Sequence, residues 1–484
     1  MNQNYRLPLL VLVLFALFTS ITAQTYRGSV RGTVYDPNRA AVPGAEIKLI
    51  STETNQTRTV ESDAEGNYTI SELRPGAYKL EVTKDGFQKQ IIGFTVAVNQ
   101  AERVDVDLAL RGASDTLVFI EPEPLQEESG SLSTVIENTQ ITGLPLDGRN
   151  FYELSLLVPG AVPAAPGSAG SVRGDFAFSV NGAREDANNF LLDGVYNIDP
   201  KLNTFGVRPS VDAIREFEML TSTYDASFGR SPGAQVNVIL NSGTNSLHGS
   251  AFEFLRNAAL DARNFFAPSN EPKPKYIRNQ FGGAIGGPIK RDRTFFFADY
   301  EGTRSREGIT RVSNVPTLEE RRGNFSQSLF GVPINPFTGM PFTNGQIPDF
   351  FIHPVGRAIA ALYPLPNRNV PFQNFVSSPT QGDDNDSFDV RVDHRLTDRA
   401  DLAFRYSFGD RDLFEPFTGP AFSVVPGFGD SVKRRSQNAM AALTLVLTPK
   451  LVNETRLAFS RVAASVTQQA SVLNSQVGLP TVTP

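Results

Sequence analysis

The sequence lacks several residue types on which common enzyme and metal sites depend. Its 484 residues include no cysteine, which excludes thiolate catalysis, disulfide bonds and thiolate metal ligands. Tryptophan is absent too, and the three histidines, His248, His353 and His394, are far apart in the sequence. No motif therefore supports a catalytic triad, a cofactor site or a metal site, and we expect that the protein is not an enzyme.

Strong charge of one sign and long apolar runs are also missing. The net charge of -6, with 20% charged residues, argues against a nucleic-acid partner, which would need a clustered basic face. Beyond the N-terminal segment no stretch is apolar enough for a transmembrane helix, so any membrane span has to consist of strands. Glycine (39), proline (33) and phenylalanine (36) are abundant, which favours strands and turns.

The N-terminal segment is typical of an export signal. Arg6 and the terminal amine supply positive charge before the apolar run 7–18, which is shorter than the ~20 residues of a spanning helix. Small residues follow and end at Ala23, after which we expect cleavage. Residues 1–23 are therefore predicted to be a signal peptide, and their short apolar run disfavours the alternative of an uncleaved anchor.

Residues 25–111 have the pattern of a small antiparallel β-sandwich. Apolar residues recur at every second position, as in 78–82, and turns containing glycine or proline separate the repeats. Short strands at this spacing favour two packed sheets. One turn could bind calcium through Asp63, Glu65 and Asn67. Because it lacks the downstream glutamate of calcium loops, a solvated turn is the preferred interpretation.

Four turn-containing phrases follow one another in this segment, at 32–36, 42–45, 63–68 and 73–78. Their order and spacing resemble the carboxypeptidase regulatory-like domain, a carbohydrate-binding-like sandwich. The resemblance implies a structural or binding role and no peptidase activity.

Residues 131–246 contain a succession of polar, glycine-rich phrases. They lie at 139–150, 179–184, 188–195, 211–219 and 228–245, and a short helix is expected at 151–154. The succession resembles the plug domain of TonB-dependent outer-membrane receptors, especially the large forms with an N-terminal sandwich. The resemblance singles out ten plug motif residues: Asn181, Gly182, Arg184, Asn189, Asp193, Gly194, Arg215, Glu216, Gly229 and Gly243.

Charged residues of this segment suggest how a plug could be held inside a barrel. Five of them are expected to pair with the inner barrel wall: Arg184, Asp186, Arg215, Glu216 and Glu218. The alternative is that they are solvated turn charges.

Residues 112–130, between the two domains, lose the strand pattern and form an acidic, proline-containing linker. Its first part is a short apolar strand with an acidic head: Asp115, Thr116, Leu117, Val118, Phe119 and Ile120. In the receptors that the plug resembles, a similar segment, the TonB box, pairs edge to edge with the energising protein TonB. Two interpretations stay open, because these residues could equally complete the sandwich.

From residue 247 onward, strands with one charged and one apolar face are predicted. In 388–396, Phe388, Val390 and Val392 share one face, and Asp389, Arg391 and Asp393 share the other. Lipid on one side and a wet lumen on the other produce this alternation, although a soluble sandwich would produce it too. The expected strands are 250–256, 279–288, 294–303, 388–396, 401–409, 437–448 and 452–461.

The connections between these strands favour the barrel. Long ones (257–278, 304–387, 410–436) alternate with short ones (289–293, 397–400, 449–451). Outer-membrane barrels have short periplasmic turns and long extracellular loops, whereas a sandwich has no reason to separate them.

Two local features of this part need interpretation. The glycines of 279–288 do not fit a nucleotide-binding loop, and we expect them to face the lumen where plug backbone comes close. The acidic run 383–386 could bind a cation, but solvated carboxylates at the end of an extracellular loop are the ordinary finding.

The sequence thus predicts a mostly β protein with an N-terminal β-sandwich, an α+β plug domain and, in 247–484, the first strands of a transmembrane antiparallel β-barrel. The resemblance implies an outer-membrane receptor with a periplasmic N-terminal domain. It would take up an unknown extracellular substrate, contact outer-membrane lipid and be energised by a TonB-type coupling protein, without cofactors.

The alternative is a non-transport surface or assembly protein whose sandwich binds carbohydrate or protein. Because barrels of this class close with about 22 strands, we also expect the protein to continue beyond residue 484.

Overall fold

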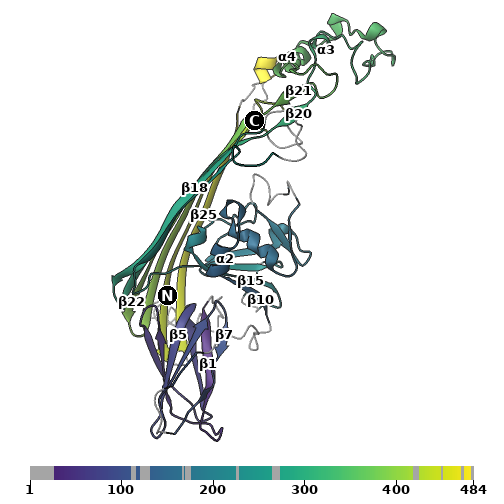
Figure 1. The fold of residues 1–484 in the computed structure, drawn as a ribbon. Coiled ribbons are helices and arrows are strands. Elements are labelled where there is room, and N and C mark those ends of the chain that lie inside the picture. The colour runs from purple at the N-terminus through teal and green to yellow at the C-terminus, as the bar shows by residue number, and fades with distance from the viewer. Residues whose placement is uncertain are drawn as a thin grey trace, which may run out of the picture.

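The computed structural model describes residues 27–110, 116–119, 131–165, 168, 176–224, 228–229, 231–263, 273–417, 425–448, 451–469 and 474–480. They form three regions in Figure 1: a purple sandwich, a blue sheet with short helices, and a tall curved sheet in green and yellow. The mostly β fold predicted from the sequence is confirmed, while the expected signal peptide lies outside the described residues. Among the described residues, no helix combines the length and apolar character needed to cross a membrane.

The N-terminal region is a sandwich of two sheets. One has the strand order β4-β1-β7, with β8 also paired to β1, and the other has the order β3-β2-β5-β6-β9. The strands are β1 Gly28–Tyr35, β2 Glu46–Ser51, β3 Thr57–Glu61, β4 Asn67–Leu73, β5 Gly76–Thr83, β6 Gln90–Val96, β7 Ala101–Arg103, β8 Val106–Asp107 and β9 Thr116–Phe119. Alternate side chains fill the space between the sheets, so Val30, Ile47 and Leu80 are fully buried.

The turn at 63–67 behaves as the preferred interpretation predicted. The Asp63 carboxylate accepts hydrogen bonds from the backbone N–H groups of Glu65 (3.1 Å) and Asn67 (2.8 Å). The acid therefore stabilises the turn itself.

The second region, called the plug below, is a five-stranded sheet with the order β10-β15-β16-β13-β14. Its strands are β10 Leu132–Glu137, β13 Asn189–Leu192, β14 Val195–Tyr196, β15 Ile214–Ser222 and β16 Gln235–Leu240, with a hairpin of β11 Ala161–Pro163 and β12 Phe178–Val180. Its short helices are α2 Asn138–Gly143, η2 Asp147–Arg149, η3 Phe151–Leu157, η5 Glu185–Ala187 and η6 Val211–Ala213. The helix expected at 151–154 is confirmed as the 3-10 helix η3. Its Tyr152 is buried and stacks on Phe205, with ring centroids 4.6 Å apart.

The third region, called the wall below, is an antiparallel seven-stranded sheet with the order β17-β18-β19-β22-β23-β24-β25. Its strands are β17 His248–Asn257, β18 Tyr276–Lys290, β19 Thr294–Gly308, β22 Thr380–Thr397, β23 Ala400–Glu415, β24 Asp430–Thr448 and β25 Leu451–Gln468. All seven expected strands are present, and each is longer than expected. The predicted faces are also correct: Asp389 and Arg391 are buried against the plug, whereas Val390, between them, is exposed on the outer face.

The two ends of the wall differ as the loop lengths predicted. Turns 291–293 and 398–399 join strands at the end next to the sandwich, and the long connection 309–379 lies at the other end (Figure 1). The connection 309–379 is partly folded, with β20 Arg311–Ser313, α3 Leu318–Arg321, η7 Thr343–Gly345, η8 Asp349–Phe351, α4 Pro354–Leu362 and β21 Phe375–Ser377. The last element is η9 Asn474–Val477.

Two expectations for the wall need correction. The acidic run 383–386 lies inside β22 rather than at a loop end, and its aspartates are paired with arginines of neighbouring strands. The pairs are Asp383–Arg411 (2.8 Å), Asp384–Arg306 (2.6 Å) and Asp386–Arg304 (2.8 Å). The run looked like a loop because its charges are unusual in a strand, but cross-strand arginines neutralise them.

The glycines of β18 face both ways. By alternation, Gly282 and Gly286 share the plug-facing side with the buried Gln280, whereas Gly283 and Gly287 face outward, so only half of them face the lumen as expected.

Candidate functional site between the plug and the wall

The tip of the β13–β14 hairpin is the point where the plug meets the wall most closely. Asp193 (φ 49°) and Gly194 (φ 73°) form its two-residue turn. Tight hairpin turns with positive φ at both residues favour the dipeptide Asp-Gly. The Asp193 carboxylate is fully buried and lies 3.2 Å from Nη1 of Arg391 on β22 and 3.0 Å from Nε of Arg405 on β23. It also accepts the backbone N–H of Leu240 at 3.1 Å. The turn thus places one carboxylate between two wall guanidiniums.

The wall side of this contact is a connected polar network. The fully buried guanidinium of Arg405 donates to Asn438 Oδ1 and Ser407 Oγ, both at 2.6 Å, and to the carbonyl of Leu192. Asn438 in turn donates to the carbonyl of Tyr196 at 2.8 Å. A buried charge is tolerated only when it is paired and hydrogen-bonded, and removal of one partner costs about 3–5 kcal/mol. We therefore regard this network as the main plug–wall contact.

Further contacts tie other parts of the plug to the wall. Arg149 bridges Asp212 of the plug and Glu301 of β19. A Cβ atom added at Gly243 would lie 2.3 Å from the carbonyl oxygen of Phe296 and 2.6 Å from that of Gly287. Only glycine fits there, because plug and wall backbones meet directly.

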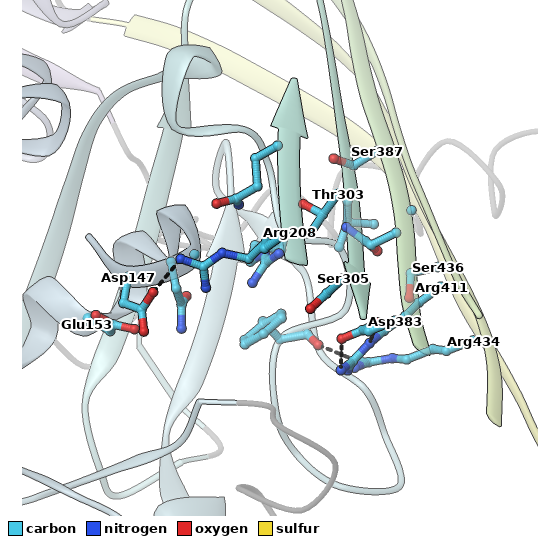
Figure 2. A pocket seen from close by; sticks show the side chains of 18 of the residues that line it. Asp147, Glu153, Arg208, Thr303, Ser305, Asp383, Ser387, Arg411, Arg434 and Ser436 are labelled. Carbon is cyan, nitrogen blue, oxygen red and sulfur yellow. Dashed lines mark hydrogen bonds and ion pairs between the residues drawn. The ribbon is translucent and has the colours of Figure 1, made fainter. Parts of the chain in front are cut away.

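Beyond the hairpin, towards the long connections, plug and wall enclose a cavity of about 330 Å³. Figure 2 shows Asp147 and Glu153 on its plug side and Asp383, Arg411 and Arg434 on its wall side. Hydroxyl and amide side chains also line it, beside Phe205, Val207 and Tyr276: Asn150, Gln280, Thr303, Ser305, Asn385, Ser387 and Ser436. This lining is suited to a polar ligand rather than an apolar one.

The charges of the cavity are only partly paired with one another. The Arg278 guanidinium, 2.5 Å from Asp147, lowers the pKa of that carboxyl. Burial, and then the negative charge of Asp147, raises the pKa of Glu153. Arg434 donates to the carbonyl of Phe205 at 2.7 Å. Arg208 also lines the cavity and makes no ion pair with any residue that the structure describes, although its positive charge partly offsets the rise in the pKa of Glu153.

The ten predicted plug motif residues serve different purposes. Asn181 (φ 51°) and Gly182 (φ 77°) form a left-handed turn, and Asn189 is buried and donates to Gln235 Oε1 at 2.7 Å. Gly229 has open space around it. Asp193, Gly194 and Gly243 contact the wall as described, and the remaining three are charged: Arg184, Arg215 and Glu216.

The expectation that five plug charges pair with the wall is wrong for the described contacts. Arg184 and Asp186 pair with each other at 2.9 Å on the surface, and Arg215 pairs with Glu53 of the sandwich. Glu216 and Glu218 are buried beneath the sandwich loop at 97–100. Sequence reasoning placed Arg391 on the charged face of its strand but did not identify its partner Asp193. The Asp-Gly dipeptide could have predicted the contact, because it marks a tight hairpin turn and the tip of such a hairpin can extend from the plug to the wall.

The predicted coupling segment is partly described. Thr116–Phe119 form β9, which pairs in parallel with β6, with Ile92 opposite Val118 in the register. Asp115 and Ile120 lie outside the described residues. The pairing is consistent with completion of the sandwich, but β9 is an edge strand held only by β6 in the described sheet, so both interpretations stay open.

Two family models match the chain. The outer membrane beta barrel domain matches residues 239–484, about half of the chain, and the carboxypeptidase regulatory-like domain matches residues 29–109. The chain therefore belongs to the outer membrane β-barrel family, and its location is the outer membrane.

The chain is also similar to individual proteins. The TonB-dependent transporter Oar of Myxococcus xanthus is 25% identical over 336 residues, which cover 64% of this chain and 30% of that protein. The outer membrane transporter YddB from Escherichia coli has a TM-score of 0.43 at 12% identity, covering 68% of this chain and 39% of its own. For the ferric enterobactin receptor of Pseudomonas aeruginosa the TM-score is 0.38 at 14% identity, with 69% and 41% covered.

The chain thus spans about a third of the length of the curated relative it matches. The family models and this relative, a transporter rather than an enzyme, confirm the resemblance to TonB-dependent receptors that carry a regulatory-like sandwich.

Proposed function

We propose that this chain supplies the sandwich, the plug and the first wall strands of a receptor that takes up a polar substrate and is energised through TonB. The supporting observation is that Arg391 and Arg405 of the wall form buried ion pairs with Asp193 of the plug, beside a polar cavity. A plug held by ion pairs stays closed at rest, yet it can be released by force without unfolding the wall.

The proposed division follows the predicted one: signal peptide 1–23, sandwich 25–111, linker 112–130, plug 131–246 and wall from 247. In this arrangement the sandwich is periplasmic, because it lies at the end of the short turns. The polar cavity then lies on the extracellular side of the hairpin, where Arg208 and the hydroxyl groups would meet the substrate. Labelling of the sandwich on intact cells would contradict this orientation and favour a surface-binding protein.

Plug movement can be tested without knowing the substrate. Residues 1–484 contain no cysteine, so Ala403→Cys introduces a single thiol into the full-length protein once any cysteine beyond residue 484 has been replaced by serine. Ala403 is 1% exposed and packs against Val195 beside the hairpin turn. We expect maleimide to label this thiol in energised cells that contain TonB and not in cells without TonB. Equal labelling in both would contradict TonB-driven movement; the exposed Asn344→Cys serves as the always-labelled control.

The coupling segment can be tested in the same protein. A disulfide between the register partners Ile92→Cys and Val118→Cys would hold β9 on β6. If β9 has to be released to engage TonB, the disulfide abolishes TonB-dependent labelling of the thiol at position 403, and a reductant restores it. Unchanged labelling would assign β9 to the sandwich.

A further inference from the structure

We propose that the sandwich is a clamp on the plug: two relays of charged side chains run from the sandwich, through the wall, to the Asp193–Gly194 turn and hold that turn in place. The contacts themselves carry this inference. Its consequence for transport, that the clamp is released before the plug moves, rests on the proposed function.

The first relay starts at the β4–β5 turn of the sandwich. Arg74 lies 2.8 Å from the carboxylate of Asp393 at the short-turn end of β22. Asp393 is 3.0 Å from Arg391 on the same strand, and Arg391 is 3.2 Å from Asp193 of the plug. Asp393, Arg391 and Asp193 are almost completely buried. Alternating charge therefore runs without a gap from the sandwich to the hairpin.

The second relay starts where the first described strand of the sandwich begins. Arg27 lies 3.3 Å from Glu454 on β25, and Glu454 is 2.5 Å from Arg456. Arg456 donates a hydrogen bond to the carbonyl of Gly194 at 3.3 Å. Both relays thus end on neighbouring residues of one two-residue turn, although they cross different wall strands.

A direct contact accompanies the relays. The Glu53 carboxylate, in the β2–β3 turn, accepts two hydrogen bonds from Arg215 of the plug at 2.7 and 3.0 Å, and the Glu53 carbonyl accepts the backbone N–H of Asn245. The next residue but one, Asn55, donates to Asp292 in the β18–β19 turn at 3.0 Å. One sandwich turn therefore contacts the plug, the plug–wall connection and the wall.

The burial of these contacts separates a clamp from incidental surface pairing. The side chains of Arg27 and Glu454 are 2% and 8% exposed, and those of Arg74 and Asp393 are 21% and 3% exposed. Exposed pairs such as Arg39–Asp107 contribute little, because solvent screens them. A buried carboxylate that loses a cation is destabilised much more. Undocking the sandwich would remove one cation each from Asp393 and Glu454, and so would weaken the hold of both relays on the hairpin.

The clamp can be tested first without TonB or substrate. In the purified full-length protein carrying Ala403→Cys, Arg27→Gln and Arg74→Gln together should raise the maleimide labelling rate about tenfold or more. Arg39→Gln, which changes an exposed sandwich arginine, should leave the rate unchanged. The sandwich should stay folded in all variants, as limited proteolysis can show. An unchanged rate in the double variant, with an intact sandwich, would overturn the clamp.

The release step needs a second experiment in cells. A reducible bifunctional thiol reagent that joins Asn55→Cys to Asp292→Cys would fix the sandwich to the wall. The reagent is applied while the thiol at position 403 is buried and therefore not accessible to it. We expect the cross-link to suppress TonB-dependent labelling at position 403 at least tenfold, and a reductant to restore it. Undiminished labelling of the cross-linked protein would overturn the release step.

The two experiments also separate the clamp from the proposed function. If the thiol at position 403 shows no TonB dependence with an unmodified sandwich, the transport proposal fails. The labelling rate of the purified double variant then still decides whether the clamp exists.

Discussion

The sandwich strand β5 and the wall strand β22 have the same alternation but bury opposite faces. In β5, Leu80 and Val82 are fully buried, while Glu81 between them faces outward. In β22, Asp389 and Arg391 are 1% and 3% exposed, while Val390 between them is 43% exposed. A period of two therefore specifies a strand with two unlike faces and leaves open which face is buried.

The part of the molecule or the environment that covers each face of a strand decides which face is buried. In the sandwich, a second sheet covers the apolar faces and removes them from water, which stabilises the fold by roughly 25 cal/mol per Å² of apolar surface. In the wall, plug charges cover the polar face, and the apolar face is expected to contact lipid. The same residue types thus stabilise one region through packing and the other through ion pairs. The predictions below test this contrast, from the largest expected effect to the smallest.

Removal of the central carboxylate should have the largest effect. Asp193→Ala leaves the buried guanidiniums of Arg391 and Arg405 without their shared partner, so we expect the plug–wall contact to lose about 3–5 kcal/mol. Urea titration of plug release, followed by proteolysis of the full-length protein, measures this loss. Asp186→Ala, which breaks an exposed pair with Arg184, should cost less than about 1 kcal/mol. Equal losses would show that the buried network is not the main contact.

Substitution of leucine by alanine should distinguish the packed core of the sandwich from the outer face of the wall. Leu80→Ala leaves a cavity in the sandwich core and should lower the free energy of unfolding by about 2–5 kcal/mol. Leu445→Ala, on the outer face of β24, should cost only about 1–2 kcal/mol, because lipid fills the space and no cavity remains. Chemical denaturation in lipid bilayers measures both. A larger loss at Leu445 would contradict a lipid-facing outer side.

An outward-facing charge provides the reverse test. Val390→Arg puts a guanidinium into the apolar band of the wall and should destabilise the protein in bilayers by about 2–4 kcal/mol. Glu81→Arg, at the corresponding outward position of the sandwich, breaks a partly exposed pair with Lys89 and should cost no more than about 1 kcal/mol. If both substitutions are tolerated, the outer face of β22 is in water.

Local patterns were sufficient to predict the sandwich and the wall, whereas the plug was predicted from its resemblance to a known family. The alternation of apolar and charged residues located all seven wall strands. The unequal connections favoured a membrane barrel over a soluble sandwich, because a barrel in a membrane separates long and short loops by side. The strand lengths were underestimated, since strands such as β22 continue past the apolar band into paired charges at 383–386. A single sequence does not show that a cross-strand arginine will neutralise each aspartate.

The site was less predictable, because its contacts join residues far apart in the chain. Asp193 was recognised as a motif residue, but its partners Arg391 and Arg405 are about 200 residues away, and nothing local specifies the pairing. Arg27 and Arg74 of the sandwich were not singled out, for the same reason. Of the five plug charges expected at the wall, Arg215, Glu216 and Glu218 were misassigned because the sandwich covers one face of the plug sheet, whereas Arg184 and Asp186 pair with each other on the surface.

That covered face of the plug has an unusual charge state. Glu216 and Glu218 of β15 are buried beneath Val98 and Asn99 of the sandwich loop. Burial raises the pKa of Glu216 to about 7 and that of Glu218 to about 8. The carboxylate of Glu137, opposite Glu216 on β10, raises the pKa of Glu216 further, whereas Arg215 lowers it. Both side chains are therefore protonated in the docked state at mildly acidic pH.

The smallest expected effect follows from this protonation. In the undocked state both carboxyls have a pKa of about 4.3. Between that pH and about 7–8, the docked state therefore holds these carboxyls protonated while the undocked state holds them ionised. The sandwich–plug contact is thus strongest at acidic pH and weakens as the pH rises through this interval. Maleimide labelling of Val98→Cys in the full-length protein, measured relative to the exposed Asn344→Cys, should accordingly accelerate from pH 5.5 to 8.5. The ratio removes the intrinsic pH dependence of thiol reactivity, because the thiolate is the reacting form in both proteins.

The double variant Glu216→Gln and Glu218→Gln separates these two carboxyls from every other titratable group of the protein. Neutral amides cannot ionise, so the relative labelling rate should stay low and nearly constant across the same interval. A pH dependence that survives in the double variant would assign the effect to other groups. A relative rate that falls with rising pH in the parent protein would contradict the sign of the linkage, and with it the burial of uncharged acids beneath the sandwich.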